Sequence, residues 1–114
     1  MALHTKQPVG VDIECYSERV ERIASRFIRA DEATHLPQIE RTRALLIHWS
    51  AKESAFKLLD EEGVDWRDHL RVHPFCLDHK GSFLLTEYKT TQAQTYSIHY
   101  WSHPEFVLTW GVQE

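Results

Sequence analysis

Residues 38–59 read QIERTRALLIHWSAKESAFKLL and carry the apolar repeat of a long α-helix. Large apolar residues recur along this stretch three, four or seven positions apart, which places them on one helix face: Leu45, Trp49, Phe56 and Leu59. Lys52 lies on the same face, between Trp49 and Phe56, where another large apolar residue would be expected. A lysine at such a position must extend its ammonium group to water or meet a negative partner.

Shorter elements flank the long helix. Alternation of side-chain type predicts a strand over residues 8–14, and a spacing of three and four predicts an amphipathic helix over residues 17–28. A helical turn is expected over residues 31–36, before Pro37, and a short helix over residues 65–70. We therefore expect one strand and several helices in the first half of the chain.

The second half of the chain has the pattern of antiparallel strands. Residues 71–77 and 82–88 form a predicted hairpin around a turn at residues 78–81, and two further strands are expected over residues 95–102 and 105–112. Trp101 and Trp110 are predicted to pack in the sheet core. One strand, then helices, then a run of strands predicts an α+β fold with helices on one side of an antiparallel sheet. The length of 114 residues suits one domain, 1–114.

Two acidic residues alternate with apolar residues in the first predicted strand. Val9, Val11 and Ile13 are expected to face the core, which places the carboxylates of Asp12 and Glu14 together on the opposite face. Two adjacent carboxylates repel each other, and a hard cation such as Mg2+ would relieve that repulsion. The spacing alone favours two solvated acids on an exposed strand face, because an Asp-x-Glu pattern occurs often by chance.

Glu53 and Lys57 lie four residues apart on the long helix and therefore share a helix face. They can be an ordinary surface ion pair, just as Lys52 can extend along the surface to water. The residues alone leave these alternatives open.

Taken together, the two regions resemble the signatures of a known family. Gly10-Val11-Asp12-Ile13-Glu14 is similar to the first signature of 4'-phosphopantetheinyl transferases. Trp49-Ser50-x-Lys52-Glu53-Ser54-x-x-Lys57, about forty residues later, is similar to the second. The tryptophan and the Asp-Ile-Glu form resemble the surfactin-synthetase-activating (Sfp) type, and the match resembles its C-terminal, metal-binding lobe.

The resemblance implies a role for each signature residue. Asp12, Glu14 and Glu53 would bind Mg2+, which clamps the pyrophosphate of coenzyme A, the co-substrate. Lys52 and Lys57 would offset phosphate charge, with Lys57 also near the leaving group. Glu53 would help to deprotonate a serine of an apo acyl or peptidyl carrier protein. That serine then accepts 4'-phosphopantetheine, a displacement that needs positioning and charge neutralisation above all.

The same resemblance implies a partner for the domain. Enzymes of the surfactin-synthetase-activating type have two similar lobes with the coenzyme site between them, and this chain corresponds to one lobe. The expectation is a fragment, in which residues 2–4 are the end of a truncated strand, or a single-lobe form that self-associates. An isolated lobe would expose an apolar interface, so we expect self-association or pairing with an N-terminal lobe.

Two rival functions remain from the sequence. A Mg2+-dependent nuclease also uses acidic clusters and a lysine, but the net charge of -4 argues against nucleic acid as a partner. A non-catalytic module that binds carrier protein or another lobe is the second rival. The two cysteines form no CxxC motif, and no apolar run suits a signal peptide or a membrane span. We therefore expect reduced thiols and a cytoplasmic protein.

Overall fold

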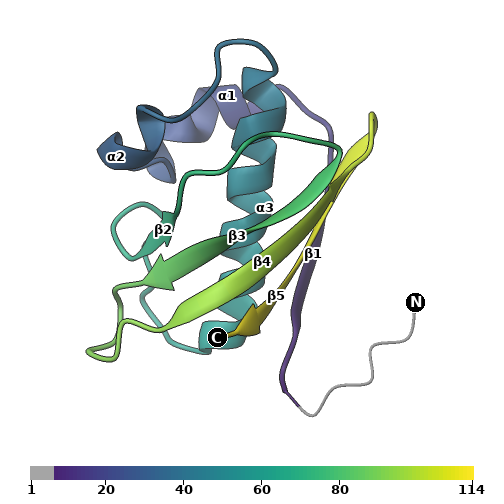
Figure 1. Cartoon of the computed structure of the whole chain (residues 1–114). Helices are drawn as coiled ribbons and strands as arrows, with labels where there is room; N and C mark the ends of the chain where they lie inside the picture. Colours follow the sequence, from purple (N-terminus) through teal and green to yellow (C-terminus); the bar gives the residue numbers. More distant parts are fainter. Residues whose placement is uncertain (1–6) are drawn as a thin grey trace.

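The long helix lies across one face of a curled antiparallel sheet, as Figure 1 shows for the computed structural model. The structure describes residues 7–114, so the strand expected at residues 2–4 lies outside the described residues. The helices are α1 (Arg19–Ile23), the 3-10 helix η1 (Ala24–Arg26), α2 (Ala30–Ala33) and α3 (Arg41–Leu59). The strands are β1 (Gly10–Cys15), β2 (Leu70–Val72), β3 (Lys80–Glu87), β4 (Thr95–Ser102) and β5 (Phe106–Gln113).

The described strands form one sheet in the order β1-β5-β4-β3-β2. Every neighbouring pair is antiparallel, and β1, the first strand in sequence, pairs with β5, the last. Helix α3 packs on the inner face of this sheet, and the short helices lie beside it. The predicted α+β class is therefore confirmed.

The core lies between α3 and the inner sheet face. A one-sided sheet must bury its apolar face against another layer, and α3 supplies that layer. The buried apolar residues of α3 meet those of the strands and of the segment after α1: Leu45, Leu46, Ile47, Ala51, Ala55, Leu59, Phe27, Ile28, Leu70, Val72, Phe83, Leu85, Tyr96, Ile98, Tyr100 and Val107.

The helices are shorter than the apolar spacing predicts. Helix α3 begins at Arg41 rather than residue 38 because Glu40 adopts a left-handed conformation (φ 62°), and Asp60 (φ 53°) ends it in the same way. The helix expected over residues 17–28 tightens into η1 after Ile23. This tightening brings two consecutive residues, Phe27 and Ile28, into the core.

Two predicted elements near the middle of the chain differ from the structure. The strand expected over residues 71–77 stops at Val72, and Pro74, which has no backbone N–H for a sheet, follows soon after. The helix expected over residues 65–70 is a turn instead. Oδ1 of Asp65 accepts hydrogen bonds from the backbone N–H groups of Arg67 (2.9 Å) and Asp68 (2.8 Å), so the side chain fixes a local turn.

Strand β1 faces the opposite way to the prediction. Val11 and Ile13 point outward, 44% and 60% exposed, whereas Gly10 and Asp12 are buried against α3. The reason is the close approach of the helix, because a Cβ added to Gly10 would lie 2.1 Å from the backbone oxygen of Ser54. Trp101 was also expected in the core and is instead 45% exposed. The outer sheet face is therefore more apolar than expected.

Candidate functional site

Strand β1 and helix α3 bring Asp12 and Lys57 together. The Lys57 ammonium donates to the backbone oxygen of Val11 at 2.6 Å and lies 3.5 Å from Oδ1 of Asp12. The Asp12 side chain is almost buried, and its second oxygen, Oδ2, has no hydrogen-bond partner. A buried carboxylate oxygen without a donor is costly, so this atom requires a cation or a donor to be stable.

Glu14 and Glu53 add two more carboxylates beside Asp12. Burial, together with the neighbouring carboxylates of Asp12 and Glu53, raises the pKa of Glu14 to about 7. The pKa of Glu53 is also raised, first by burial and then by Asp12, while Lys57 and Trp66 oppose the rise. The three acids that the sequence singles out therefore lie near enough to repel one another, with one lysine to balance them.

The chemistry of this group suits a hard divalent ion. All three side chains offer oxygen donors, and Oδ2 of Asp12 lacks a partner that such an ion would supply. Within residues 7–114, no set of three or more acidic, histidine or cysteine side chains is already arranged to hold a metal. The three carboxylates therefore lie near one another, but their oxygens do not point to one common position. The residues present fit the ion by their charge and donor type.

Lys52 points away from this group into the core. Its ammonium is fully buried and donates to Oε1 of Glu32 at 2.8 Å and to the backbone oxygen of Phe27 at 2.5 Å. Because Lys52 and Lys57 are five residues apart, they leave the helix in different directions. The lysine on the apolar stripe thus meets a negative partner, and that partner is Glu32.

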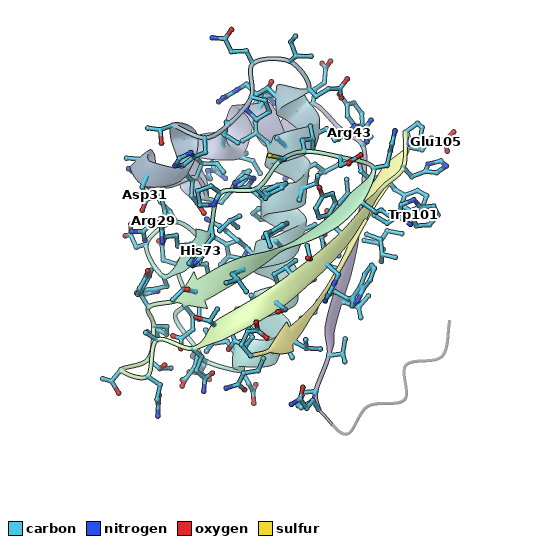
Figure 2. All side chains as sticks on the ribbon, viewed as in Figure 1. Arg29, Asp31, Arg43, His73, Trp101 and Glu105 are labelled. Carbon is cyan, nitrogen blue, oxygen red and sulfur yellow. The ribbon has the colours of Figure 1, made fainter. Side chains whose placement is uncertain are left out.

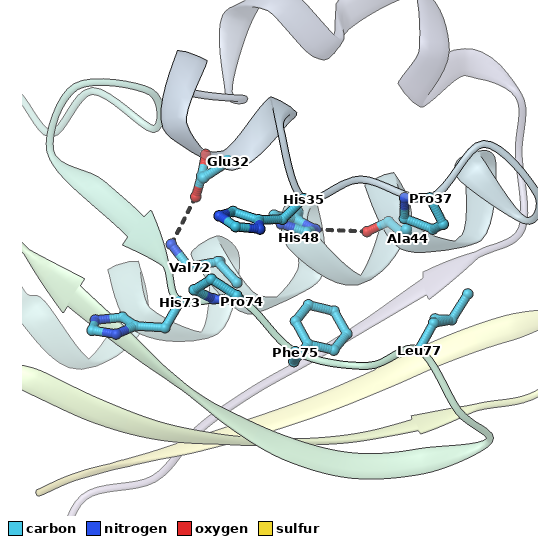
Figure 3. Close-up of a pocket in the computed structure, with 10 residues that line it drawn as sticks. All are labelled: Glu32, His35, Pro37, Ala44, His48, Val72, His73, Pro74, Phe75 and Leu77. Atoms are coloured by element: carbon cyan, nitrogen blue, oxygen red, sulfur yellow. Dashed lines mark hydrogen bonds between the residues drawn. The ribbon is translucent and has the colours of Figure 1, made fainter.

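Glu32 is the residue that sequence reasoning missed. Besides Lys52, its carboxylate accepts hydrogen bonds from the backbone N–H groups of Arg29 (2.8 Å) and Val72 (2.7 Å), as Figure 3 shows for the latter. It therefore ties α2 to both α3 and β2. The available signal was Lys52 itself, since a lysine in an apolar stripe requires a buried acid if it does not reach water.

A hollow of about 590 Å3 opens beside the acidic group. Glu14 and Trp49 line it, together with Arg19 and Arg26 from α1 and η1. The wall thus combines a metal-suited carboxylate, an aromatic ring and two guanidinium groups, which are good partners for phosphate. This arrangement can hold a phosphorylated ligand next to the three carboxylates.

Comparison with known proteins identifies the family of this chain. The family model of the 4'-phosphopantetheinyl transferase superfamily (ACPS) matches residues 8–110, which span β1 through most of β5. This chain belongs to that superfamily. A search among curated proteins finds no significant match to this chain. No helix in the described part of the domain is long and apolar enough to cross a membrane.

A second, smaller cavity in the domain is lined by histidines. It measures about 20 Å3, room for about one water molecule, and His35, His48 and His73 border it together with Glu32 (Figure 3). Nδ1 of His48 lies 2.8 Å from the backbone oxygen of Ala44. Because a carbonyl oxygen can only accept a hydrogen bond, Nδ1 of His48 carries a proton and donates it to Ala44. Burial lowers the pKa of His48, so the neutral form is the stable one.

This buried histidine predicts acid sensitivity. A pKa that is lower in the folded state means that the unfolded chain binds the proton more tightly, so stability is lost as pH falls below about 6.5. Burial also lowers the pKa of His73, which acts in the same direction, whereas the raised pKa of Glu14 opposes it. We expect His48→Asn to flatten the fall in unfolding free energy between pH 7 and pH 5. Urea titrations of both proteins across this range measure the slopes, and equal slopes would contradict the assignment.

Proposed function

We propose that this domain transfers 4'-phosphopantetheine from coenzyme A to a serine of an apo acyl or peptidyl carrier protein. The proposal takes the domain to be of the surfactin-synthetase-activating type and equivalent to its metal-binding lobe. The proposal is carried by one observation in a chain of this superfamily. Glu14 and Glu53 lie close to Asp12, whose buried Oδ2 has no hydrogen-bond partner.

The three carboxylates would hold Mg2+, which when bound supplies positive charge against the pyrophosphate of coenzyme A. Lys57 already lies at Asp12 with half of its side chain exposed, so its ammonium is available to offset charge on the phosphate and on the leaving group. Glu53 is half-buried with a raised pKa, which suits a group that accepts the proton of the carrier serine, directly or through water.

For Lys52 we propose a supporting contribution. Its sequence resemblance implies a phosphate contact, but its ammonium is fully buried against Glu32. In this conformation Lys52 acts by holding α2 against α3. Arg29, next to α2, donates to the backbone oxygens of Arg67 and Asp68, which directly follow Asp65 and Trp66 in the wall of the hollow. The Lys52–Glu32 pair therefore also supports this wall.

A transfer assay tests the proposal. Incubation with coenzyme A, Mg2+ and an apo carrier protein is expected to increase the mass of the carrier by one phosphopantetheine group. Glu53→Gln and Asp12→Asn should each abolish this transfer, whereas Glu114→Gln, at an exposed acid beyond the end of β5, should leave it unchanged. Carrier binding that survives all three substitutions without any transfer would instead support a non-catalytic interaction module.

We further propose that the domain self-associates through its outer sheet face, or pairs there with another lobe. The register places Ile13, Leu108 and Trp101 side by side across β1, β5 and β4, and Val11 lies beside Trp110 in the next row. Exposed apolar patches of this kind mark interaction sites. Trp101 projects outward from the strands in Figure 2.

Sedimentation velocity measures this association. We expect the wild-type domain to sediment as a species larger than one chain, and Trp101→Lys to shift it to the monomer because a charge would be buried in the interface. The matched control is Ile39→Lys, because Ile39 is 83% exposed just before α3 and away from the sheet. A wild-type monomer at high concentration would contradict the proposal.

A further inference from the structure

The described chain has two buried side-chain atoms without a hydrogen-bond partner, one on Asp12 and one on Trp66. One is the acceptor Oδ2 of Asp12, described above. The other is a donor, Nε1 of Trp66, on the loop between α3 and β2. An unpaired buried N–H group is costly, so it calls for an acceptor in the functional state of the protein.

The position of the Trp66 ring shows which acceptor is near. Its centroid lies 4.6 Å from that of Phe56 and 6.3 Å from that of Trp49. Trp49, Glu53 and Phe56 share one face of α3, at spacings of four and three residues. The indole therefore lies across the helix turn that carries Glu53. The N–H has no hydrogen-bond partner in this arrangement, and Trp66 lines the same hollow as Glu14 and Trp49.

The loop that carries Trp66 is held in place on both sides. Asp65 accepts hydrogen bonds from two backbone N–H groups of the turn, and its own N–H donates to Nδ1 of His69 at 2.8 Å. From the other side, the Arg29 guanidinium donates to the backbone oxygen of Asp68 at 2.9 Å. A loop fixed by its own contacts can present a side chain in one orientation, which is what a supporting residue of a metal site requires.

We infer that Trp66 is a positioning residue for Glu53, and that its indole N–H donates to the Glu53 carboxylate and orients the oxygens towards Asp12 and Glu14. The inference rests on the proposed metal-dependent transfer. Trp66 does not contact the reacting atoms. It acts through Glu53, as residues that hydrogen-bond a ligating carboxylate generally do.

The test compares Trp66→Phe with the wild-type domain. Phenylalanine keeps an aromatic ring on Phe56, removes the N–H donor and makes the side chain smaller. We expect Mg2+ affinity, measured by calorimetry with the metal alone, to fall about 10-fold, the lower end of the effect of losing a ligand's supporting hydrogen bond. The matched control is Trp101→Phe, on the outer sheet face, which should bind Mg2+ as tightly as wild type.

A spectroscopic measurement separates positioning from packing. The indole N–H resonance of Trp66 is assigned by its loss in Trp66→Phe and followed in nitrogen–proton correlation spectra. It should shift between wild type and Glu53→Gln without metal, and shift on addition of Mg2+ only in wild type. The Trp101 resonance should not move in either comparison.

Two results would overturn the inference. One is a Trp66 resonance that is the same in Glu53→Gln and wild type. The other is a resonance that responds to inorganic phosphate without Mg2+, which would assign the N–H to the phosphorylated ligand instead. A wild-type domain that binds no Mg2+ would contradict the proposed function, whereas the metal-free comparison would still decide whether Trp66 contacts Glu53.

Discussion

Replacement of Lys52 by methionine is expected to destabilise the domain by about 3–5 kcal/mol, because it leaves the Glu32 carboxylate buried without its charged partner. Both side chains are completely buried, and the ammonium and carboxylate are 2.8 Å apart. Methionine has a similar length and no charge, so the packing volume changes little. Since small domains have about 5–15 kcal/mol of stability in total, this loss would leave much of the protein unfolded at modest urea concentrations.

The double variant Lys52→Met/Glu32→Gln is the matched control. Glutamine is uncharged and its amide oxygen can still accept from the backbone N–H of Val72 or Arg29, so we expect the double variant to be more stable than Lys52→Met alone. Urea unfolding of the three proteins gives the coupling energy between the two residues. If Lys52→Met were as stable as wild type, the Lys52–Glu32 ion pair would not support α2.

Replacement of Gly10 by alanine is expected to lower the free energy of unfolding. The loss should reach or exceed the upper end of the roughly 1–3 kcal/mol typical of overpacked cores. The added Cβ would lie 2.1 Å from the backbone oxygen of Ser54 and 3.0 Å from Cγ of Leu58. A backbone atom in the middle of α3 cannot move aside as a side chain can. The helix must therefore shift away from β1, which also separates Lys57 from Asp12.

Gly81→Ala is the control for this substitution. Gly81 lies at the exposed start of β3. The atoms nearest to an added Cβ there belong to the side chain of Tyr100, at 3.0 to 3.2 Å, so a smaller adjustment suffices. We expect unfolding free energy and Mg2+ affinity to fall together in Gly10→Ala and to remain near wild type in Gly81→Ala. Equal stability of the two variants would show that the close contact of helix and strand is not required.

The sequence predicted the sheet and the long helix because their signals are local. Alternation and helical spacing depend on neighbouring residues, and β4 runs from Thr95 to Ser102 as the pattern indicates. The boundaries near Glu40 and Val72 differ because they depend on a left-handed residue and on the position of Pro74. Neither feature changes the apolar pattern by itself.

The sequence could single out the residues of the candidate site but not the contacts that surround them. Asp12, Glu14, Glu53 and Lys57 were singled out by spacing and resemblance, and the structure places them close together. The partner of Lys52 depends on how α2 docks, a contact between residues 20 positions apart that no local pattern encodes. The orientation of β1 was also missed, because a strand with apolar Val11 and Ile13 can face the core or a second protein equally well.

The most direct test of the proposed function is calorimetric titration of the domain with coenzyme A in the presence and absence of Mg2+. We predict binding that requires the metal and is lost in Asp12→Asn, which removes the negative charge from the carboxylate whose Oδ2 has no hydrogen-bond partner. Glu114→Gln should bind as wild type does. Coenzyme A binding that is absent at high protein concentration, or that is equally tight without Mg2+, would contradict the proposed metal site.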